Sequence, residues 1–137
     1  MIGRWVGQYA VAAVIFGVLD GLWLGLVAAP LYDAQLGHLL AEQPNVLAAG
    51  AFYVIYVAGL TYFATHPAVV EGSWRRALLS GGLLGLVAYA TWDLTNLAVL
   101  ADFPATIVLV DLAWGTFVSA VTALGTYAVA RAVPFLH

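Results

Sequence analysis

"GGLLGLVAYATWDLTNLAVL", residues 81–100, is a mostly apolar stretch that carries a single charged residue, Asp93. A helix needs about 20 such residues to cross the hydrocarbon core of a membrane. A charged side chain in hydrocarbon costs several kcal/mol, so an aspartate there needs a partner or a function. The stretch therefore predicts a membrane-spanning helix that contributes to a polar site.

The composition of the whole chain agrees with this reading. Of 137 residues, 64% are hydrophobic and only 8% are charged, whereas soluble domains carry about 25% charged residues. Too few polar side chains remain to cover a globule in water, so we expect an integral membrane protein in a lipid bilayer. The chain has no cysteine, and no basic run, phosphate-binding glycine loop or zinc-ligand spacing is present, so we expect neither a nucleic-acid partner nor a metal site.

Three further stretches are long and apolar enough to cross a membrane, which predicts one transmembrane domain over residues 1–137. The expected spans are Trp5–Ala29, Asn45–Thr65, Trp74–Leu100 and Phe103–Ala130. Pro30 and Pro67 follow the first two spans and are expected to end them, because proline disrupts a helix interior. The fold class that follows is all-α, an integral membrane four-helix bundle with up-down topology.

Two polar residues and one loop complete this prediction. Ser73 and Asp102 are expected as N-caps of the third and fourth spans, with Pro104 in the first turn of the fourth. Residues 31–43 form the one longer connection, in which apolar residues recur at roughly helical spacing. We expect this segment to lie flat on the outer surface as an interfacial helix.

The basic residues predict an orientation. In a four-span chain, Arg4, Arg75, Arg76 and Arg131 all fall on one side, and the opposite side carries acids but no Lys or Arg. Lys and Arg are enriched in cytoplasmic loops. We therefore expect both termini in the cytoplasm.

Three aspartates lie at similar depths in different spans. Asp20, Asp93 and Asp111 are each seven to ten residues from the predicted outer end of their span, which corresponds to about 10–15 Å along a helix. Tyr53 and Tyr56 of the second span reach the same depth. The sequence thus predicts a polar layer in the outer half of the membrane.

Small residues share helix faces with these aspartates. Such faces let helices approach closely in membranes, so we expect the aspartates to point into the bundle. The faces comprise Gly17, Asp20, Gly21 and Gly25 on the first span, Gly81, Gly85, Tyr89 and Asp93 on the third, and Asp111, Gly115 and Ser119 on the fourth.

A tryptophan accompanies each acid, and Asn96 follows Asp93 by one turn. An indole N–H can donate to a carboxylate while its ring forms an apolar wall. The candidate ligand-binding, proton-binding or cation-binding residues are Asp20, Asp93, Asp111, Asn96, Trp23, Trp92, Trp114, Tyr53 and Tyr56. Two other interpretations stay open: the aromatic residues as membrane-interface anchors, and the acids as hydrogen-bonding contacts that only hold helices together.

Four stretches resemble the signature segments of the DUF2177 family of small bacterial membrane proteins. They are "DGLWLG" (20–25), "FYVIYVAGL" (52–60), "YATWDLTNLAVL" (89–100) and "VDLAWG" (110–115). The resemblance implies four spans and a location in the bacterial inner (cytoplasmic) membrane. It implies no catalytic residue, substrate or cofactor.

The residues favour binding or transport of a small molecule or ion, because intramembrane acids commonly serve such roles. Four spans are few to enclose a path, so this interpretation implies a homodimer or a larger membrane complex. Two alternatives remain. One is an accessory or structural subunit of a membrane complex. The other is a membrane enzyme acting on a lipid or isoprenoid-like substrate, with paired carboxyls as general acid and base or, with Asn96, as metal ligands.

Overall fold

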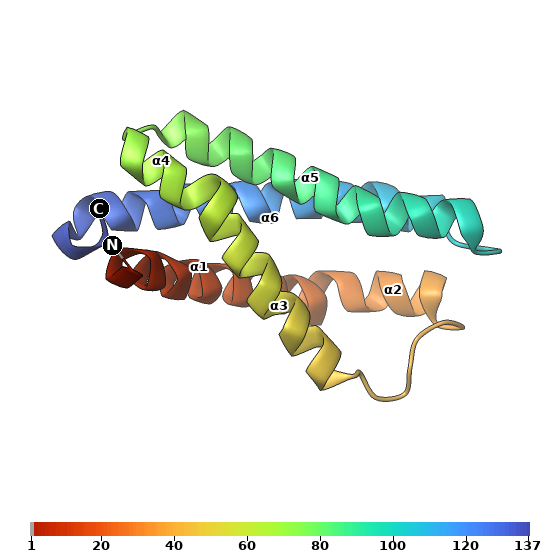
Figure 1. Cartoon of the computed structure of the whole chain (residues 1–137). Coiled ribbons are helices and arrows are strands. Elements are labelled where there is room, and N and C mark those ends of the chain that lie inside the picture. The colour runs from red at the N-terminus through yellow and green to blue at the C-terminus, as the bar shows by residue number, and fades with distance from the viewer. Residues whose placement is uncertain (1) are drawn as a thin grey trace.

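The computed structural model describes residues 2–137, and this part of the chain folds into helices without a strand. Four continuous helical segments are long and apolar enough to cross a membrane: Ile2–Leu36, Val46–Glu71, Trp74–Val99 and Ala105–Ala132. They run alternately up and down, and both ends of the chain lie at the same end of the bundle (Figure 1). The prediction of an all-α four-helix membrane bundle is confirmed.

The distribution of side chains is that of a protein dissolved in lipid. Large apolar residues such as Val14, Leu47, Leu79 and Leu109 are exposed on the outside. The buried polar or charged residues are Gln8, Asp20, Thr61, Thr65, Asp93, Asp111, Ser119, Thr122 and Thr126. In water the outer surface would carry most of the charged and polar groups instead, so the fold matches the predicted bilayer environment.

The first spanning segment does not end at Pro30, and that prediction is wrong. It consists of α1 (Ile2–Leu22), the π-helical η1 (Trp23–Ala28) and α2 (Ala29–Leu36), with the proline in the first turn of α2. A local π-helical adjustment satisfies backbone groups that a proline would otherwise leave without partners. The helix therefore passes through the proline and continues to Leu36.

The second spanning segment also passes through its proline by means of a π-helical turn. The prediction that it stops before Pro67 is therefore wrong. It consists of α3 (Val46–Leu60), the π-helical η2 (Thr61–Thr65) and α4 (His66–Glu71). Pro67 again falls in the first turn after the π-helical segment. Both prolines thus mark irregular turns within spans.

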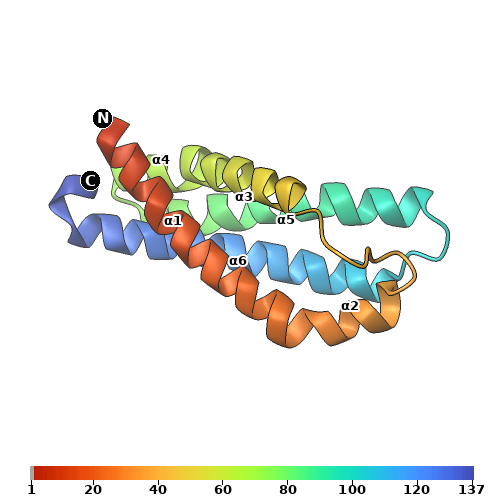
Figure 2. The ribbon, with the colours of Figure 1, turned by 90° about the horizontal axis from the view of Figure 1, so that it is seen from below.

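The predicted flat interfacial helix over residues 31–43 is replaced by a different arrangement. Residues 31–36 belong to α2, which follows α1 after a bend and lies beside the end of α6 (Figures 1 and 2). Only residues 37–45 form the non-helical connection to α3. This segment therefore adds length to the first helix, and it brings Tyr32 into the bundle.

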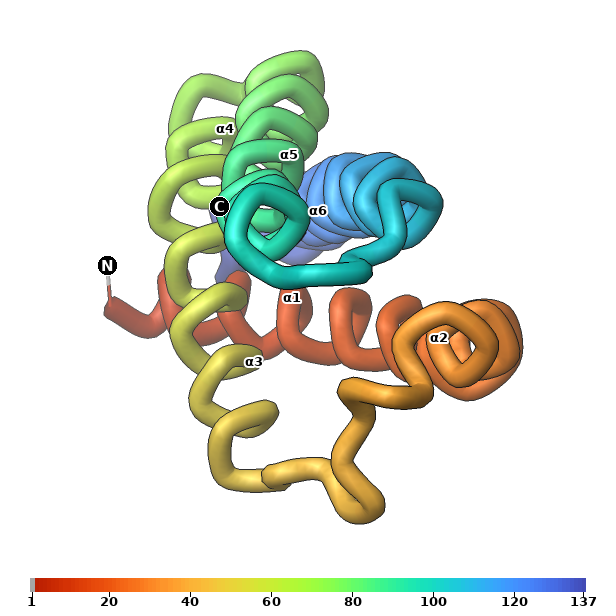
Figure 3. The backbone as a smooth tube through the Cα atoms, turned by 90° about the vertical axis from the view of Figure 1, so that its right-hand side faces the viewer, coloured from red at the N-terminus to blue at the C-terminus, as the bar shows by residue number. Residues whose placement is uncertain are grey.

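The second span crosses the bundle obliquely. Its end segments η2 and α4 pack against α5, whereas the beginning of α3 diverges from α5 and α6 (Figures 1 and 3). The residues at that diverging end, 46–52, are exposed. At the end opposite the two chain termini, the bundle therefore rests mainly on the first, third and fourth spans.

The helices α5 (Trp74–Val99) and α6 (Ala105–Ala132) form the most extensive contact. A Cβ atom added at Gly81 would come within 2.7 Å of the Cβ of Ala123, and one at Gly85 would come within 2.6 Å of the Ser119 hydroxyl oxygen. The Tyr89 ring lies over Gly115. The predicted small-residue faces on these two helices are confirmed.

The glycine face of α1 behaves differently. The bundle-facing residues of α1 are Gln8, Ala12, Phe16 and Asp20, which recur at steps of four. Gly17, Gly21 and Gly25 lie one residue further along and are exposed, with nothing within 4 Å of an added Cβ. The prediction that these glycines pack against other helices of the same chain is therefore wrong, because consecutive residues of a helix point about 100° apart.

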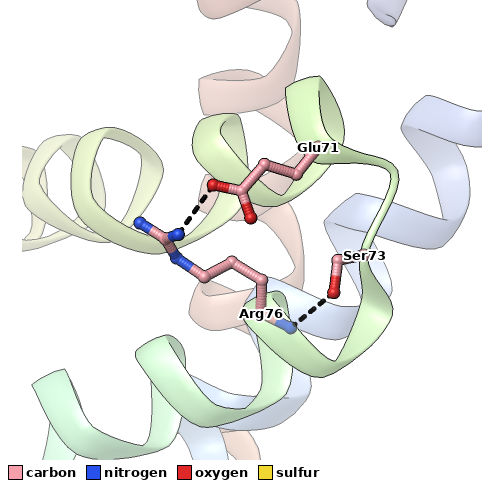
Figure 4. Close-up of polar contacts among 3 residues, drawn as sticks. All are labelled: Glu71, Ser73 and Arg76. Carbon is pink, nitrogen blue, oxygen red and sulfur yellow. Dashed lines mark hydrogen bonds and ion pairs between the residues drawn. The ribbon is translucent and has the colours of Figure 1, made fainter.

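The turn between α4 and α5 confirms the predicted Ser73 cap. Gly72 adopts a left-handed conformation with φ 67°, and the Ser73 hydroxyl accepts a hydrogen bond from the Arg76 backbone N–H at 3.2 Å. The Arg76 guanidinium pairs with Glu71 at 2.7 Å across the same turn (Figure 4). This end of the bundle is thus closed by a short, locally satisfied turn.

The predicted Asp102 cap of α6 is wrong. Asp102 adopts φ 59°, and Pro104 occupies the position before Ala105, the first residue of α6, without a side-chain cap. A residue that precedes proline is driven out of the helical conformation, so Phe103 cannot belong to the helix. Asp102 instead makes the left-handed bend that an aspartate tolerates. The chain closes with the short 3₁₀ helix η3 (Pro134–Leu136).

Candidate functional site

A cavity of about 450 Å³ lies between the first, third and fourth spans and receives side chains from all three predicted aspartates. Its lining comprises Asp20, Trp23, Leu24, Tyr32, Phe52, Ala88, Tyr89, Trp92, Asp93, Asp111 and Trp114. Pockets of this volume hold small organic molecules. The structure therefore brings together, around one space, acids that lie up to 91 positions apart in the chain (20 to 111).

Asp20 is the most fully hydrogen-bonded of the three acids. Its Oδ1 accepts from the Trp114 indole N–H at 3.1 Å, and its Oδ2 accepts from the Tyr53 hydroxyl. These bonds connect α1 to α6 and to α3. Trp114 thus donates to an acid on another helix and not to Asp111, the acid three residues before it in the same helix.

Asp111 accepts a hydrogen bond from the Tyr32 hydroxyl through its Oδ1. Tyr32 lies in α2, beyond Pro30, so this contact depends on the helix continuing through the proline. It ties the C-terminal part of the first span to α6.

Asp93 is fully buried at 0% exposure, and neither of its carboxylate oxygens has a hydrogen-bond partner within residues 2–137. Asp111 is the acid that interacts with it electrostatically. Two neighbouring carboxyls cannot both be ionised without a cost in free energy. A cation or a proton between the two carboxyls would remove that cost. The carboxyl of Asp93 is therefore the group in the cavity that lacks a hydrogen-bond partner.

Aromatic rings form the walls around these acids. Trp23 and Trp114 stack with ring centroids 4.5 Å apart and planes 6° from parallel. The Trp23 indole nitrogen is buried and has no hydrogen-bond partner in the described part of the chain. Trp92 lines the cavity with a side chain that is 54% exposed and packs edge-on against Phe103. The cavity therefore combines carboxyls with the faces of large π-systems.

Three predicted site residues lie outside the cavity lining. Tyr53 contacts the site only through its hydroxyl on Asp20, and its ring lines a separate groove with Gly17. Tyr56 is buried and shares a 2.6 Å hydrogen bond with Ser119. Asn96 is half-buried and does not line the cavity, because it sits nearer the C-terminal end of α5.

The predicted site does not include two tyrosines that line the cavity, Tyr32 and Tyr89. The sequence predicts Tyr32 in an interfacial segment and Tyr89 on the small-residue face of the third span. Asp20, Leu24, Ala28 and Tyr32 recur at steps of four, and a π-helical segment turns less per residue than an α-helix, which keeps such residues on one face. This spacing through Pro30 is the signal that could have identified Tyr32.

The cavity lining contains three carboxyls and no Lys, Arg or His. Within residues 2–137, no three His, Cys, Asp or Glu side chains are grouped closely enough to hold a metal ion. The arrangement offers hydrogen-bond acceptors, negative charge and aromatic faces in a space whose lining is mostly apolar. Its chemistry suits a guest that carries positive charge or N–H and O–H donors.

Residues 5–128 match the model of the DUF2177 family, which is described as a predicted membrane protein. The chain therefore belongs to this family. No curated protein and no solved structure matches the chain.

Proposed function

We propose that this DUF2177 membrane protein binds a small organic cation in the cavity lined by Asp20, Asp93 and Asp111, as a carrier or receptor for that cation within the membrane. The observation that carries the proposal is Asp93, a fully buried carboxyl without a hydrogen-bond partner in the described chain. Burying a carboxylate without compensation costs several kcal/mol. A bound cation would offset that cost, and no basic side chain of the cavity lining can do so.

The aromatic walls support an organic cation over a bare metal ion. A cation held against the face of a tryptophan or tyrosine gains about 2 kcal/mol when it is desolvated. Trp23, Trp92, Trp114 and Tyr89 supply such faces around the acids. The cavity volume of about 450 Å³ is also larger than a bare ion needs.

A titration with phenyltrimethylammonium and with its uncharged carbon analogue tert-butylbenzene tests the proposal. Binding is followed by the fluorescence of the cavity tryptophans in purified protein, with protein-free micelles as the blank. We expect the cation to bind at least about tenfold more tightly, because the analogue has the same shape and lacks the charge. Equal affinity for the two compounds would mean that the cavity is only an apolar space.

A second observation favours a partner helix. Gly17, Gly21 and Gly25 form an exposed face on the first span with open space beside each residue. Glycines at this spacing allow helix backbones to approach closely in membranes. We propose that this face pairs with the same face of a second copy, which would give the four-span chain the homodimer that a transport path needs.

The orientation is proposed from charge. The four arginines belong to the ends of helices at which both termini and the α4–α5 turn lie (Figure 1). Positive charge is enriched on the cytoplasmic side. We therefore propose that both termini are cytoplasmic and that the protein resides in the bacterial inner membrane.

Single-cysteine variants test both proposals, because the chain has no cysteine of its own. Oxidation should cross-link Gly21→Cys in membranes and leave Leu79→Cys, an exposed position on α5, monomeric.

The orientation is tested by labelling. An impermeant thiol reagent should label Gln43→Cys from outside the inner membrane and Phe135→Cys only after lysis. Labelling of Phe135→Cys in intact membranes would contradict the proposed orientation. In the cross-linking experiment, equal cross-linking at the α1 and α5 positions would argue against a specific contact through the glycine face.

A further inference from the structure

A second cavity, of about 270 Å³, lies at the end of the bundle where the two chain termini meet. It is lined by Arg4 and Gln8 of α1, His66 of α4, Arg131 of α6 and the C-terminal His137, with two valines of α4. It therefore lies at the opposite end of the spans from the outer segment α2. Its lining is basic, whereas the lining of the first cavity is acidic.

Gln8 fixes one wall of this cavity through two hydrogen bonds. The side chain is fully buried, and its amide N–H donates to the Leu136 carbonyl at 2.6 Å. The amide oxygen is therefore the atom that faces His66, and it accepts from the His66 Nδ1 at 3.0 Å. This pair of bonds joins α1, α4 and η3 into a fixed wall.

The two arginines of this cavity have no protein partner. Neither Arg4 nor Arg131 makes an ion pair or a side-chain hydrogen bond within residues 2–137. Glu71 belongs to the same end of the bundle and is already paired with Arg76 (Figure 4). No carboxylate side chain lines the cavity. Two guanidinium groups from different helices thus flank a space in which no acidic side chain of residues 2–137 pairs with them.

We propose that this cavity binds an anion that carries a phosphate group, held between Arg4 and Arg131. A guanidinium presents its N–H donors in a planar fork that matches the oxygens of a phosphate. The source of the phosphate is a phospholipid headgroup or a free phosphate. The position at the ends of spanning helices places the arginines where basic pockets between such helices bind anionic headgroups.

The apolar part of the lining agrees with a lipid source. Val70 belongs to the cavity lining and is 71% exposed on the outside of the bundle. An acyl chain can follow this apolar surface while the headgroup enters between the arginines. A free phosphate would use only the basic part of the same cavity.

Binding titrations on delipidated protein in a neutral detergent test the proposal with three probes: short-chain phosphatidylglycerol, short-chain phosphatidylcholine and inorganic phosphate. The wild-type chain should bind phosphatidylglycerol or inorganic phosphate, and phosphatidylcholine much more weakly. The Arg4→Gln/Arg131→Gln variant should bind about thirtyfold more weakly, since each basic residue near an anionic headgroup contributes roughly fivefold. Phosphatidylglycerol that resists displacement by excess inorganic phosphate identifies the headgroup, and tight binding of inorganic phosphate alone identifies the free anion.

Arg75→Gln is the matched control, because Arg75 is exposed at the same end of the bundle, stacks on Trp74 and lies outside the cavity. It should change affinity by less than about twofold. If the double glutamine variant loses its helicity, Arg4→Lys/Arg131→Lys keeps the charges and should still bind several-fold more weakly, because lysine lacks the fork. Equal losses in Arg75→Gln and the double variant, or no preference among the three probes, would overturn the proposal.

Discussion

The Asp93→Asn variant is expected to bind phenyltrimethylammonium about thirtyfold more weakly than the wild-type chain, or more. Removing one charged partner from a desolvated pair costs about 2–5 kcal/mol, and 2 kcal/mol corresponds to about thirtyfold in affinity. Asparagine keeps the size of the side chain and one oxygen acceptor, so the loss reports the charge. The measurement is the same fluorescence titration that compares the cation with tert-butylbenzene.

Asp33→Asn provides the control for this variant. Asp33 is an exposed acid of α2 outside the cavity, so the same chemical change should leave the affinity within about twofold. Affinity for tert-butylbenzene should be equal in both variants, since the cavity keeps its shape. Wild-type affinity for the cation in Asp93→Asn would show that Asp93 is not the group that holds it.

The stability of Asp93→Asn distinguishes a ligand site from a helix-packing contact. Asp93 has no hydrogen-bond partner in the described chain, so replacing it with a neutral amide should leave the free energy of unfolding unchanged or higher. Asp20 accepts two side-chain hydrogen bonds, and Asp20→Asn can keep only one acceptor oxygen. Asp20→Asn should therefore lose about 1 kcal/mol.

The Gly85→Ala variant is expected to lower the free energy of unfolding by about 1–3 kcal/mol, the typical cost of overpacking a tight core. A Cβ atom there would meet the Gly115 carbonyl oxygen and would come within 2.7 Å of the Ser119 Cβ. A backbone carbonyl cannot rotate away, so α5 and α6 must separate. The change is measured by loss of helical circular dichroism during denaturation in detergent.

Gly82→Ala is the matched control, three residues earlier on the same helix. The nearest atom to its added Cβ is the Cβ of Ala120 at 3.6 Å, an ordinary van der Waals distance. Alanine has the higher helix propensity by about 1 kcal/mol, so Gly82→Ala should be neutral or stabilising. Equal destabilisation by both variants would mean that the α5–α6 contact is looser than the distances indicate.

The membrane class, the four spans and the inward direction of the aspartates could be predicted because each follows from local composition or helical periodicity. The span ends at Pro30 and Pro67 could not, because local preference treats proline as a helix terminator. The neighbouring π-helical turns η1 and η2 accommodate both prolines. The error at Pro30 also explains why Tyr32 was missed, since its hydroxyl reaches Asp111 only from a helix that continues.

The glycine faces also show a feature that could be predicted from the sequence and one that could not. All three contain small residues at steps of four, and the sequence does not distinguish them. Gly85 and Gly115 are in tight contact between α5 and α6, whereas Gly21 has open space beside it. Which face is buried follows from the way the helices pack against one another and not from a local sequence pattern.

The membrane environment, the four spans and the three acids on inward faces follow from the amino-acid sequence alone, because hydrophobicity and helical periodicity act within single segments. The groups that face those acids follow instead from the packing of the helices. Asp20 accepts hydrogen bonds from two other helices, Asp111 accepts one from α2, and Asp93 accepts none within residues 2–137 and faces the carboxyl of Asp111. These contacts could not be predicted from single segments, because hydrogen bonds and cavities between helices depend on the angles at which the helices cross and on where each helix ends. The packing of all four spans together sets both.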